Sequence, residues 1–183
     1  MCGRYTLFTE EDNQQIKQIL EHLKEHPLRP QMKTGEIFPT NLAPIITNIR
    51  DKEYDIFKWG FEFKSLIINA RAETIFEKKS FIDPIKNGRC LVPATGFYEW
   101  DKFKNKYHYT LEENMPIYMA GIYRSNHFVI ITTNANQSLE KVHDRMPVII
   151  NEKYKEDWLY DNKATLALLN QEQPQLREKL IIK

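Results

Sequence analysis

Short apolar segments separated by polar turns run through the middle of the chain, and this alternation decides how its strands can pair. Between residues 96 and 123 the segments are joined by turns such as residues 102–106 and 112–114, which favour antiparallel hairpins over helical crossovers. The pattern predicts an α+β fold with a curved, mostly antiparallel β-sheet or barrel core and flanking helices. Strands are expected near residues 43–49, 54–59, 66–69, 90–93, 96–101, 106–111, 116–123 and 127–133.

Helices are expected at both ends of this strand-rich region. Thr9, followed by three acidic residues at positions 10–12, is typical of a helix start, and apolar residues then recur at helical spacing until Pro27. Asn151 is expected to cap a second helix, and the polar C-terminal region is expected to continue helically over residues 166–180. Two short helices are expected around residues 73–79 and 81–86.

Composition and charge limit the classes of protein to which the chain can belong. With 183 residues, 42% of them hydrophobic and 28% charged, it is expected to form one domain over residues 1–183. The formal net charge of +1 argues against a bulk electrostatic grip on nucleic acid and leaves a local one open. No apolar run approaches the roughly 20 residues that a bilayer crossing needs, and the first residues lack a secretory signal, so we expect no membrane association and a cytoplasmic protein.

The sequence gives little support for a metal or a cofactor. Cys2 and Cys90 are far apart, which argues against a disulfide framework and a cysteine-based zinc site. His22 and His26 match the spacing H-x-x-E-H, but Pro27 ends the helix there and no third ligand is evident. There is no glycine-rich phosphate loop. We therefore expect no metal, no cofactor and a monomer.

Cys2 has the most distinctive chemistry in the chain. A small residue after the initiator usually means that Met1 is removed, which makes Cys2 the mature N-terminus. Its α-amine, with a pKa of about 8, and its thiol, with a pKa of about 8.5, are then both expected to be nucleophilic near neutral pH with little tuning. Such an aminothiol reacts with an aldehyde first through nitrogen, giving an imine, and then through sulfur, which closes a thiazolidine ring.

Three other segments place a reactive polar residue among residues that otherwise look like core. They are Asn69-Ala70-Arg71-Ala72-Glu73-Thr74, Gly96-Phe97-Tyr98-Glu99-Trp100 and His143-Asp144-Arg145-Met146-Pro147. Each also has a purely structural interpretation: Asn69 as a strand-end cap, Glu99 as the partner of an internal arginine, and His143 bonded to the backbone. The start at Cys2 favours the functional interpretation of the set.

Together with Met1-Cys2-Gly3-Arg4, these segments closely resemble, in this order, the motifs of the SRAP family (SOS-response-associated peptidase). The resemblance extends from residue 2 to about residue 150. It implies an SRAP-like fold in a single SRAP domain, and a protein that protects abasic sites in single-stranded DNA. In a bacterial cell such a protein is expected in the cytoplasm, at damaged DNA of the nucleoid.

The resemblance implies a catalytic set drawn from these motifs. In it Cys2 is the nucleophile, Asn69 holds the α-amine, Glu99 is the acid/base and His143 is a second proton-transfer group. Because Glu99 lies between two aromatic residues, desolvation is expected to raise its pKa. Asn69 is expected to accept a hydrogen bond from the amine. His143, with an unperturbed pKa of about 6.5, can move protons in either direction.

The resemblance also implies a set of DNA contacts. Arg4 and Arg71 are expected to anchor phosphates on either side of the lesion, and such contacts do not distinguish one base from another. Pro39 and Trp59 are expected to shape the surface near the lesion. Each arginine taken alone also has the ordinary interpretation of an internal ion pair.

Two departures from the family pattern affect these expectations. Only residues 61–68 separate Trp59-Gly60 from Asn69, where many members carry a longer segment, so a smaller DNA-facing surface is expected there. The C-terminal strand of the family is not evident after Leu159, where the sequence pattern predicts helix instead.

The expected function is that of an abasic-site sensor in single-stranded DNA. Cys2 would form a covalent thiazolidine crosslink and shield the lesion from strand cleavage, with autopeptidase and abasic-site lyase activities as further expectations. One alternative is a thiol hydrolase in which Cys2 attacks an amide, His143 is the base and Asn69 belongs to the oxyanion site. Only Met1 precedes Cys2, so no long propeptide is expected. The other alternative is a non-catalytic module that binds single-stranded DNA.

Overall fold

The computed structural model describes residues 2–9, 13–49 and 51–182, which are organised around two curved β-sheets. The first sheet has the strand order β14-β10-β9-β1-β2, and its strands are β1 (Tyr5–Leu7), β2 (Gly35–Ile37), β9 (Gly96–Trp100), β10 (Lys106–Thr110) and β14 (Arg177–Ile181). The second has the order β11-β8-β3-β4-β12-β13, with β7 beside β12, and its strands are β3 (Leu42–Thr47), β4 (Tyr54–Trp59), β7 (Asn69–Arg71), β8 (Arg89–Ala94), β11 (Ile117–Arg124), β12 (His127–Asn134) and β13 (Arg145–Pro147). A small hairpin joins β5 (Phe61–Glu62) and β6 (Leu66–Ile67).

Antiparallel pairing dominates both sheets, and the turn at residues 102–106 joins a hairpin as predicted. No hairpin forms at residues 112–114, which make a short 3-10 helix and lead from the first sheet to the second. β9 and β10 form one hairpin, and β11 and β12 form another. Within the described part of the chain, parallel pairing is confined to β12 with β4 and β7. β11 pairs with both β8 and β12, which curves the second sheet strongly without closing a clean barrel. The predicted α+β fold with a curved, mostly antiparallel sheet is confirmed.

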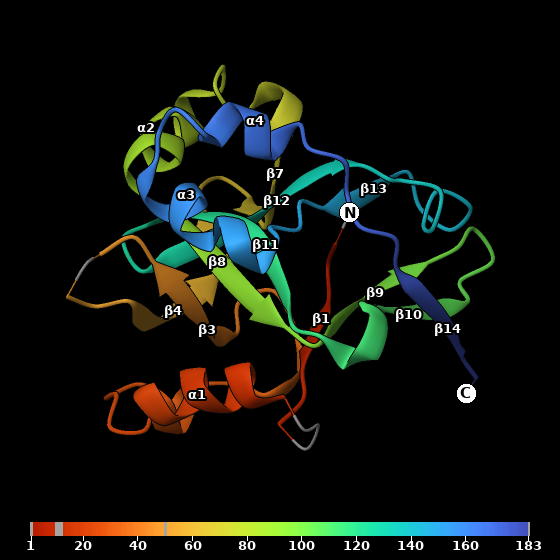
Figure 1. Ribbon diagram of the computed structural model, residues 1–183, viewed down its shortest axis with the longest axis horizontal. Helices are drawn as coiled ribbons and strands as arrows, with labels where there is room; N and C mark the ends of the chain where they lie inside the picture. The colour runs from red at the N-terminus through yellow and green to blue at the C-terminus, as the bar shows by residue number, and fades with distance from the viewer. Residues whose placement is uncertain (1, 10–12, 50, 183) are drawn as a thin grey trace.

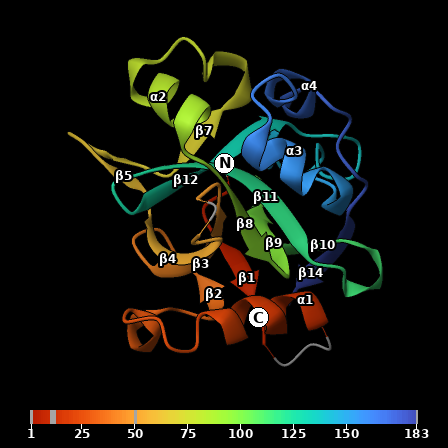
Figure 2. The same ribbon diagram turned by 60° about the vertical axis from the view of Figure 1, so that its left-hand side comes forward.

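Helices cover opposite ends of the sheets (Figure 1). α1 (Gln14–His22) lies at one end, and α2 (Lys79–Asn87), α3 (Lys155–Tyr160) and α4 (Thr165–Leu169) lie together at the other, as the turned view in Figure 2 also shows. The 3-10 helices of the described residues are η1 (Arg29–Gln31), η2 (Ala72–Thr74), η3 (Glu112–Asn114) and η4 (Glu152–Tyr154). None of the described helices has both the length and the apolar composition that a bilayer crossing requires.

α1 begins later than the sequence pattern predicts. Its N-cap is Asn13, whose side-chain oxygen accepts a hydrogen bond of 3.1 Å from Ile16 N. The acidic residues 10–12, on which the prediction partly rested, lie outside the described residues. Ile16 and Ile19 are buried, and the helix ends before Pro27 as predicted.

The C-terminal region contradicts the prediction of a helix through residue 180. α4 ends at Leu169, and β14 then pairs with β10 in a register that runs from Thr110↔Arg177 to Lys106↔Ile181. The side chains of β14 are mostly exposed, so its sequence lacks the alternation that marks a half-buried strand. Its Arg, Glu, Lys and Leu residues favour helix by intrinsic propensity, and pairing with β10 overrides that preference. The first sheet therefore does include a C-terminal strand.

The helix predicted at residues 73–79 is also wrong. η2 covers only Ala72–Thr74, and the next helix, α2, begins at Lys79 and includes the predicted residues 81–86. Residues 76–79 are exposed, so no continuous apolar face holds them in a helix. The cap predicted at Asn151 is present, since its side chain accepts a hydrogen bond from Lys153 N at the start of η4.

Arg89 ties two of the helices to the second sheet. It is only 2% exposed and begins β8. Its guanidinium donates to backbone carbonyls near the C-terminal ends of α2 and α3, where the partial negative charge of each helix gathers. The acceptors are Ile85 O, Lys86 O, Trp158 O, Leu159 O and the side-chain oxygen of Asn162.

Candidate active site

Cys2 lies ahead of β1, separated from it by Gly3 and Arg4, and alongside the strand that carries Glu99. β1 pairs with β9, and a hydrogen bond of 2.9 Å from Tyr98 N to Arg4 O extends this pairing toward the beginning of the chain. Cys2 is fully buried, and its Sγ lies 4.0 Å from Arg4 O. The antiparallel pairing of β1 with β9 therefore brings the predicted nucleophile next to the predicted acid/base.

Burial changes the chemistry expected of Cys2. It raises the pKa of the Cys2 thiol far above its ordinary value, and the negative charge of Glu99 raises it further. The expectation of a thiol that is reactive near neutral pH with little tuning is therefore wrong. The thiol is therefore protonated at neutral pH.

Asn69 holds the backbone of Cys2. It begins β7, and its Nδ2 donates a hydrogen bond of 3.0 Å to Cys2 O. Its Oδ1 is buried and has no hydrogen-bond partner among the described residues. The amide is thus oriented by one bond to Cys2 and retains an acceptor for a second one.

Glu99 lies on β9 and is 3% exposed. Its burial raises the pKa of the carboxyl to about 7. The negative charge of Asp144 contributes to this rise, which places the turn before β13 in the electrostatic surroundings of Glu99. The predicted rise in the Glu99 pKa by desolvation is confirmed, and the group is divided between its acid and base forms near neutral pH.

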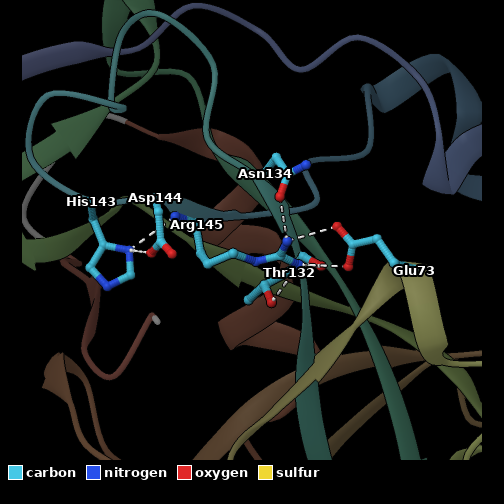
Figure 3. A network of polar contacts seen from close by, with 6 residues as sticks. All are labelled: Glu73, Thr132, Asn134, His143, Asp144 and Arg145. Carbon is cyan, nitrogen blue, oxygen red and sulfur yellow. Dashed lines mark hydrogen bonds and ion pairs between the residues drawn. The ribbon is translucent and has the colours of Figure 1, made fainter.

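His143 lies in the turn that leads into β13, and its ring is shown in Figure 3. Its Nδ1 accepts a hydrogen bond of 3.0 Å from Arg145 N and lies 3.0 Å from Asp144 Oδ1. Burial lowers the pKa of His143 below its ordinary value, so the ring is neutral near pH 7. Because Nδ1 accepts from Arg145 N in the neutral ring, the proton is then on Nε2.

The two predicted phosphate contacts have different surroundings. Arg4 is partly buried, its Nη1 lies 3.4 Å from Glu36 Oε2, and its guanidinium stacks 4.2 Å from the centre of the Phe38 ring. Arg71 ends β7 and is exposed. No pattern in the sequence indicates Glu36 as the partner of Arg4, because Glu36 lies on β2, 32 residues away along the chain.

Pro39 and Trp59 are joined through one loop. Trp59 N donates to Asn41 O and Thr40 N donates to Trp59 O, so the end of β4 holds the loop that carries the partly exposed Pro39. The Trp59 ring is fully buried, and its Nε1 donates to Ile68 O at 3.0 Å. The backbone of Trp59 therefore holds this loop, and its own ring is not exposed.

No cluster of three or more His, Cys, Asp or Glu side chains among the described residues is arranged to hold a metal ion. His22 and His26, which match H-x-x-E-H, have separate partners. His22 Nδ1 lies 2.8 Å from Gln18 O, and His26 Nε2 lies 2.9 Å from Asp55 Oδ1.

Comparison with known proteins identifies the family. The model of the family described as SOS response associated peptidase (SRAP) matches residues 1–181. The chain belongs to the SRAP family. The resemblance seen in the four motifs is therefore confirmed, and it extends beyond residue 150 to the C-terminal strand.

Individual SRAP proteins are similar to this chain along most of their length. The abasic site processing protein YoqW of Bacillus subtilis is 34% identical over 187 residues, which cover 87% of this chain and 80% of YoqW. The abasic site processing protein YedK of Escherichia coli is 28% identical over 182 residues, covering 87% and 79%. A crystal structure of a Bacteroides thetaiotaomicron protein superposes with a TM-score of 0.76 at 27% identity, covering 99% of this chain and 92% of that one.

Proposed function

We propose that this SRAP protein captures abasic sites in single-stranded DNA as a covalent thiazolidine crosslink through Cys2, after removal of Met1. The observation that carries the proposal is the arrangement around Cys2. Asn69 donates a hydrogen bond to the backbone carbonyl of Cys2, and the buried Glu99 lies on the neighbouring strand with a pKa of about 7. The names of its relatives YoqW and YedK support abasic-site processing.

The first step is the opening of the abasic sugar, which exists mostly as a closed hemiacetal. Opening removes a proton from the anomeric hydroxyl and delivers one to the ring oxygen, which yields an aldehyde. Glu99 can perform both transfers, because a carboxyl with a pKa of about 7 is present in both forms near neutral pH. Neutral His143, with its proton on Nε2, can donate to a sugar oxygen.

The second step forms the imine. The α-amine of Cys2 adds to the aldehyde carbon, and loss of one water molecule from the adduct leaves a carbon–nitrogen double bond. The buried Oδ1 of Asn69 can accept a hydrogen bond from that amine and orient its lone pair without adding charge. Protonated Glu99 can supply the proton that converts the departing hydroxyl to water.

The third step closes the ring. The sulfur of Cys2 adds to the imine carbon, its proton is transferred to the imine nitrogen, and the product is a thiazolidine. A base must accept the thiol proton, because burial keeps the thiol protonated, and ionised Glu99 on the adjacent strand is suited to that role. Ring closure removes the imine, which would otherwise acidify the neighbouring sugar carbon and lead to strand cleavage by β-elimination.

We assign the DNA contacts to the surface around this site. Arg4 and the exposed Arg71 bind phosphates on either side of the lesion, and the loop that carries Pro39 shapes the path of the strand, with Trp59 supporting it from within. Because phosphate contacts carry no base code, binding is expected to be independent of sequence.

A denaturing gel with mass spectrometry tests the proposal. Protein whose Met1 has been removed is incubated with a single-stranded oligonucleotide that carries one abasic site. We expect an adduct with the mass of protein plus DNA minus one water. Cys2→Ala retains a terminal amine, so it is expected to nick the strand through the imine and to lose the heat-stable adduct.

Three outcomes would overturn the proposal. A heat-stable adduct formed by Cys2→Ala would remove the sulfur from the mechanism. Equal binding of intact and abasic strands without any adduct would favour a DNA-binding module, and release of a peptide without an adduct would favour the hydrolase.

A further inference from the structure

Asn69 and His143 reach the candidate site from opposite sides of β12. β7, which begins with Asn69, runs parallel to β12 on one side, and β13, which follows the His143 turn, runs antiparallel on the other. Thr132 of β12 lies opposite Arg71 in the first pairing and opposite Pro147 in the second. Besides this shared pairing with β12, one side chain connects the two segments across the strand.

Arg145 makes that connection, as Figure 3 shows. Its guanidinium donates to both carboxylate oxygens of Glu73, at 2.7 and 2.9 Å, to Asn134 Oδ1 at 2.7 Å and to Thr132 O at 2.7 Å. Its backbone N donates to His143 Nδ1 at 3.0 Å. A single residue thus contacts the His143 ring, β12, and the short η2 helix that directly follows β7.

We propose that Arg145 and Glu73 are positioning residues that set the geometry of His143 and of β7, which carries Asn69, for the crosslinking reaction. This inference rests on the proposed function. Neither residue touches the reacting atoms in this assignment. Glu73 acts through η2 and β7, and Arg145 acts through its own backbone on the ring.

The structure of the pair suits this role better than that of a surface ion pair. The Arg145 side chain is 8% exposed and the Glu73 side chain 44% exposed, and a planar guanidinium that meets a carboxylate through two parallel hydrogen bonds fixes direction as well as distance. The hydrogen bond from Arg145 holds the pKa of Glu73 below its ordinary value, so the pair stays charged at neutral pH. A lysine at position 145 would keep the charge and lose the planar geometry.

The test compares Glu73→Gln and Arg145→Lys with a matched control, Glu21→Gln, which breaks an exposed ion pair on α1. Three quantities are measured for each: the single-turnover rate of crosslinking at saturating abasic DNA, the Kd for an oligonucleotide carrying a tetrahydrofuran abasic analogue that cannot open to an aldehyde, and unfolding by urea. We expect both site variants to crosslink about tenfold more slowly, with a Kd within about threefold of the wild type. The double variant should be no slower than the slower single variant, because the two residues act as one unit.

Wild-type rates in both variants would overturn the inference, as would a rate loss that is matched by the loss in Kd or that also appears in Glu21→Gln. If a site variant is unfolded, Asn134→Ala supplies the measurement, because it removes one contact to Arg145 and leaves the ion pair with Glu73. We expect this variant to lose less crosslinking rate than the site variants would. An unchanged rate would count against the inference. Absence of any adduct with the wild-type protein would instead reject the proposed function itself.

Discussion

Burial raises the pKa of two acidic side chains in the candidate site. The pKa of the Glu99 carboxyl rises to about 7, and the pKa of the Cys2 thiol rises far above its ordinary value. The His143 ring is neutral and carries its proton on Nε2. Near neutral pH the site therefore contains protonated groups beside the amine that our proposal makes the first nucleophile.

The proton-transfer role of Glu99 predicts a pH-dependent loss of rate in Glu99→Gln. General acid–base catalysis contributes about 10²–10⁴-fold, and we expect the variant to slow crosslinking within this range near pH 7. Because the proposal uses Glu99 as an acid in imine formation and as a base in ring closure, the ratio of wild-type to variant rates should be largest near its pKa of about 7 and shrink toward about pH 5.5 and about pH 8.5. Single-turnover rates across this range measure the ratio. The control is Glu140→Gln, which replaces an exposed carboxylate. A ratio of wild-type to Glu99→Gln rates that does not change with pH would contradict the proton-transfer role of Glu99.

The sequence allows the properties of some of these residues to be predicted, while the properties of others depend on the fold. The raised pKa of Glu99 was predicted from its aromatic sequence neighbours, but in β9 the side chains of Tyr98 and Trp100 lie on the opposite face of the strand, so its desolvation comes from other parts of the fold. The shifts of Cys2 and His143 depend on packing by segments far away in the chain, as does the pairing of Arg4 with Glu36. Local sequence contains no information about such distant neighbours.

At the level of elements, the same distinction between local and distant information holds. The hairpins β9–β10 and β11–β12 pair strands that are neighbours in the sequence, and these strands were predictable. β1, β2 and β14 are short or exposed strands that exist because of their partners, and no local pattern marked them. The hairpins form the scaffold, and β1, which the pattern missed, leads Cys2 into it.

The link between α2, α3 and β8 through Arg89 predicts a large loss of stability in Arg89→Met. The variant keeps the buried volume and leaves several helix-end carbonyls without their donor, and we expect a loss of about 2–4 kcal/mol in the free energy of unfolding. Urea denaturation measures it. Arg177→Met on the exposed β14 should change stability by about 0.5 kcal/mol or less. Equal losses in the two variants would show that the carbonyl contacts of Arg89 contribute little.

For the whole molecule, the buried carboxyl predicts that stability falls as the pH rises. The folded-state pKa of Glu99 is raised above its ordinary value, so its favourable contribution is fully present below about pH 4.5 and is lost as the pH rises through about 7. A shift of this size corresponds to a free energy on the order of 3 kcal/mol. Urea denaturation between about pH 5 and pH 8.5 should show this decline in the wild type and a weaker one in Glu99→Gln, which is then the more stable protein at about pH 8.5. Parallel pH profiles of the two proteins would contradict the expectation.

The complete burial of Cys2 beside β9 has a practical consequence for handling the protein. An affinity tag placed ahead of this residue acylates its nitrogen, which removes the nucleophilic amine that our proposal requires. Recombinant preparations with a leader at that end are expected to be inert toward aldehydes, while fusions made after the 85% exposed Ile182 are expected to keep full reactivity.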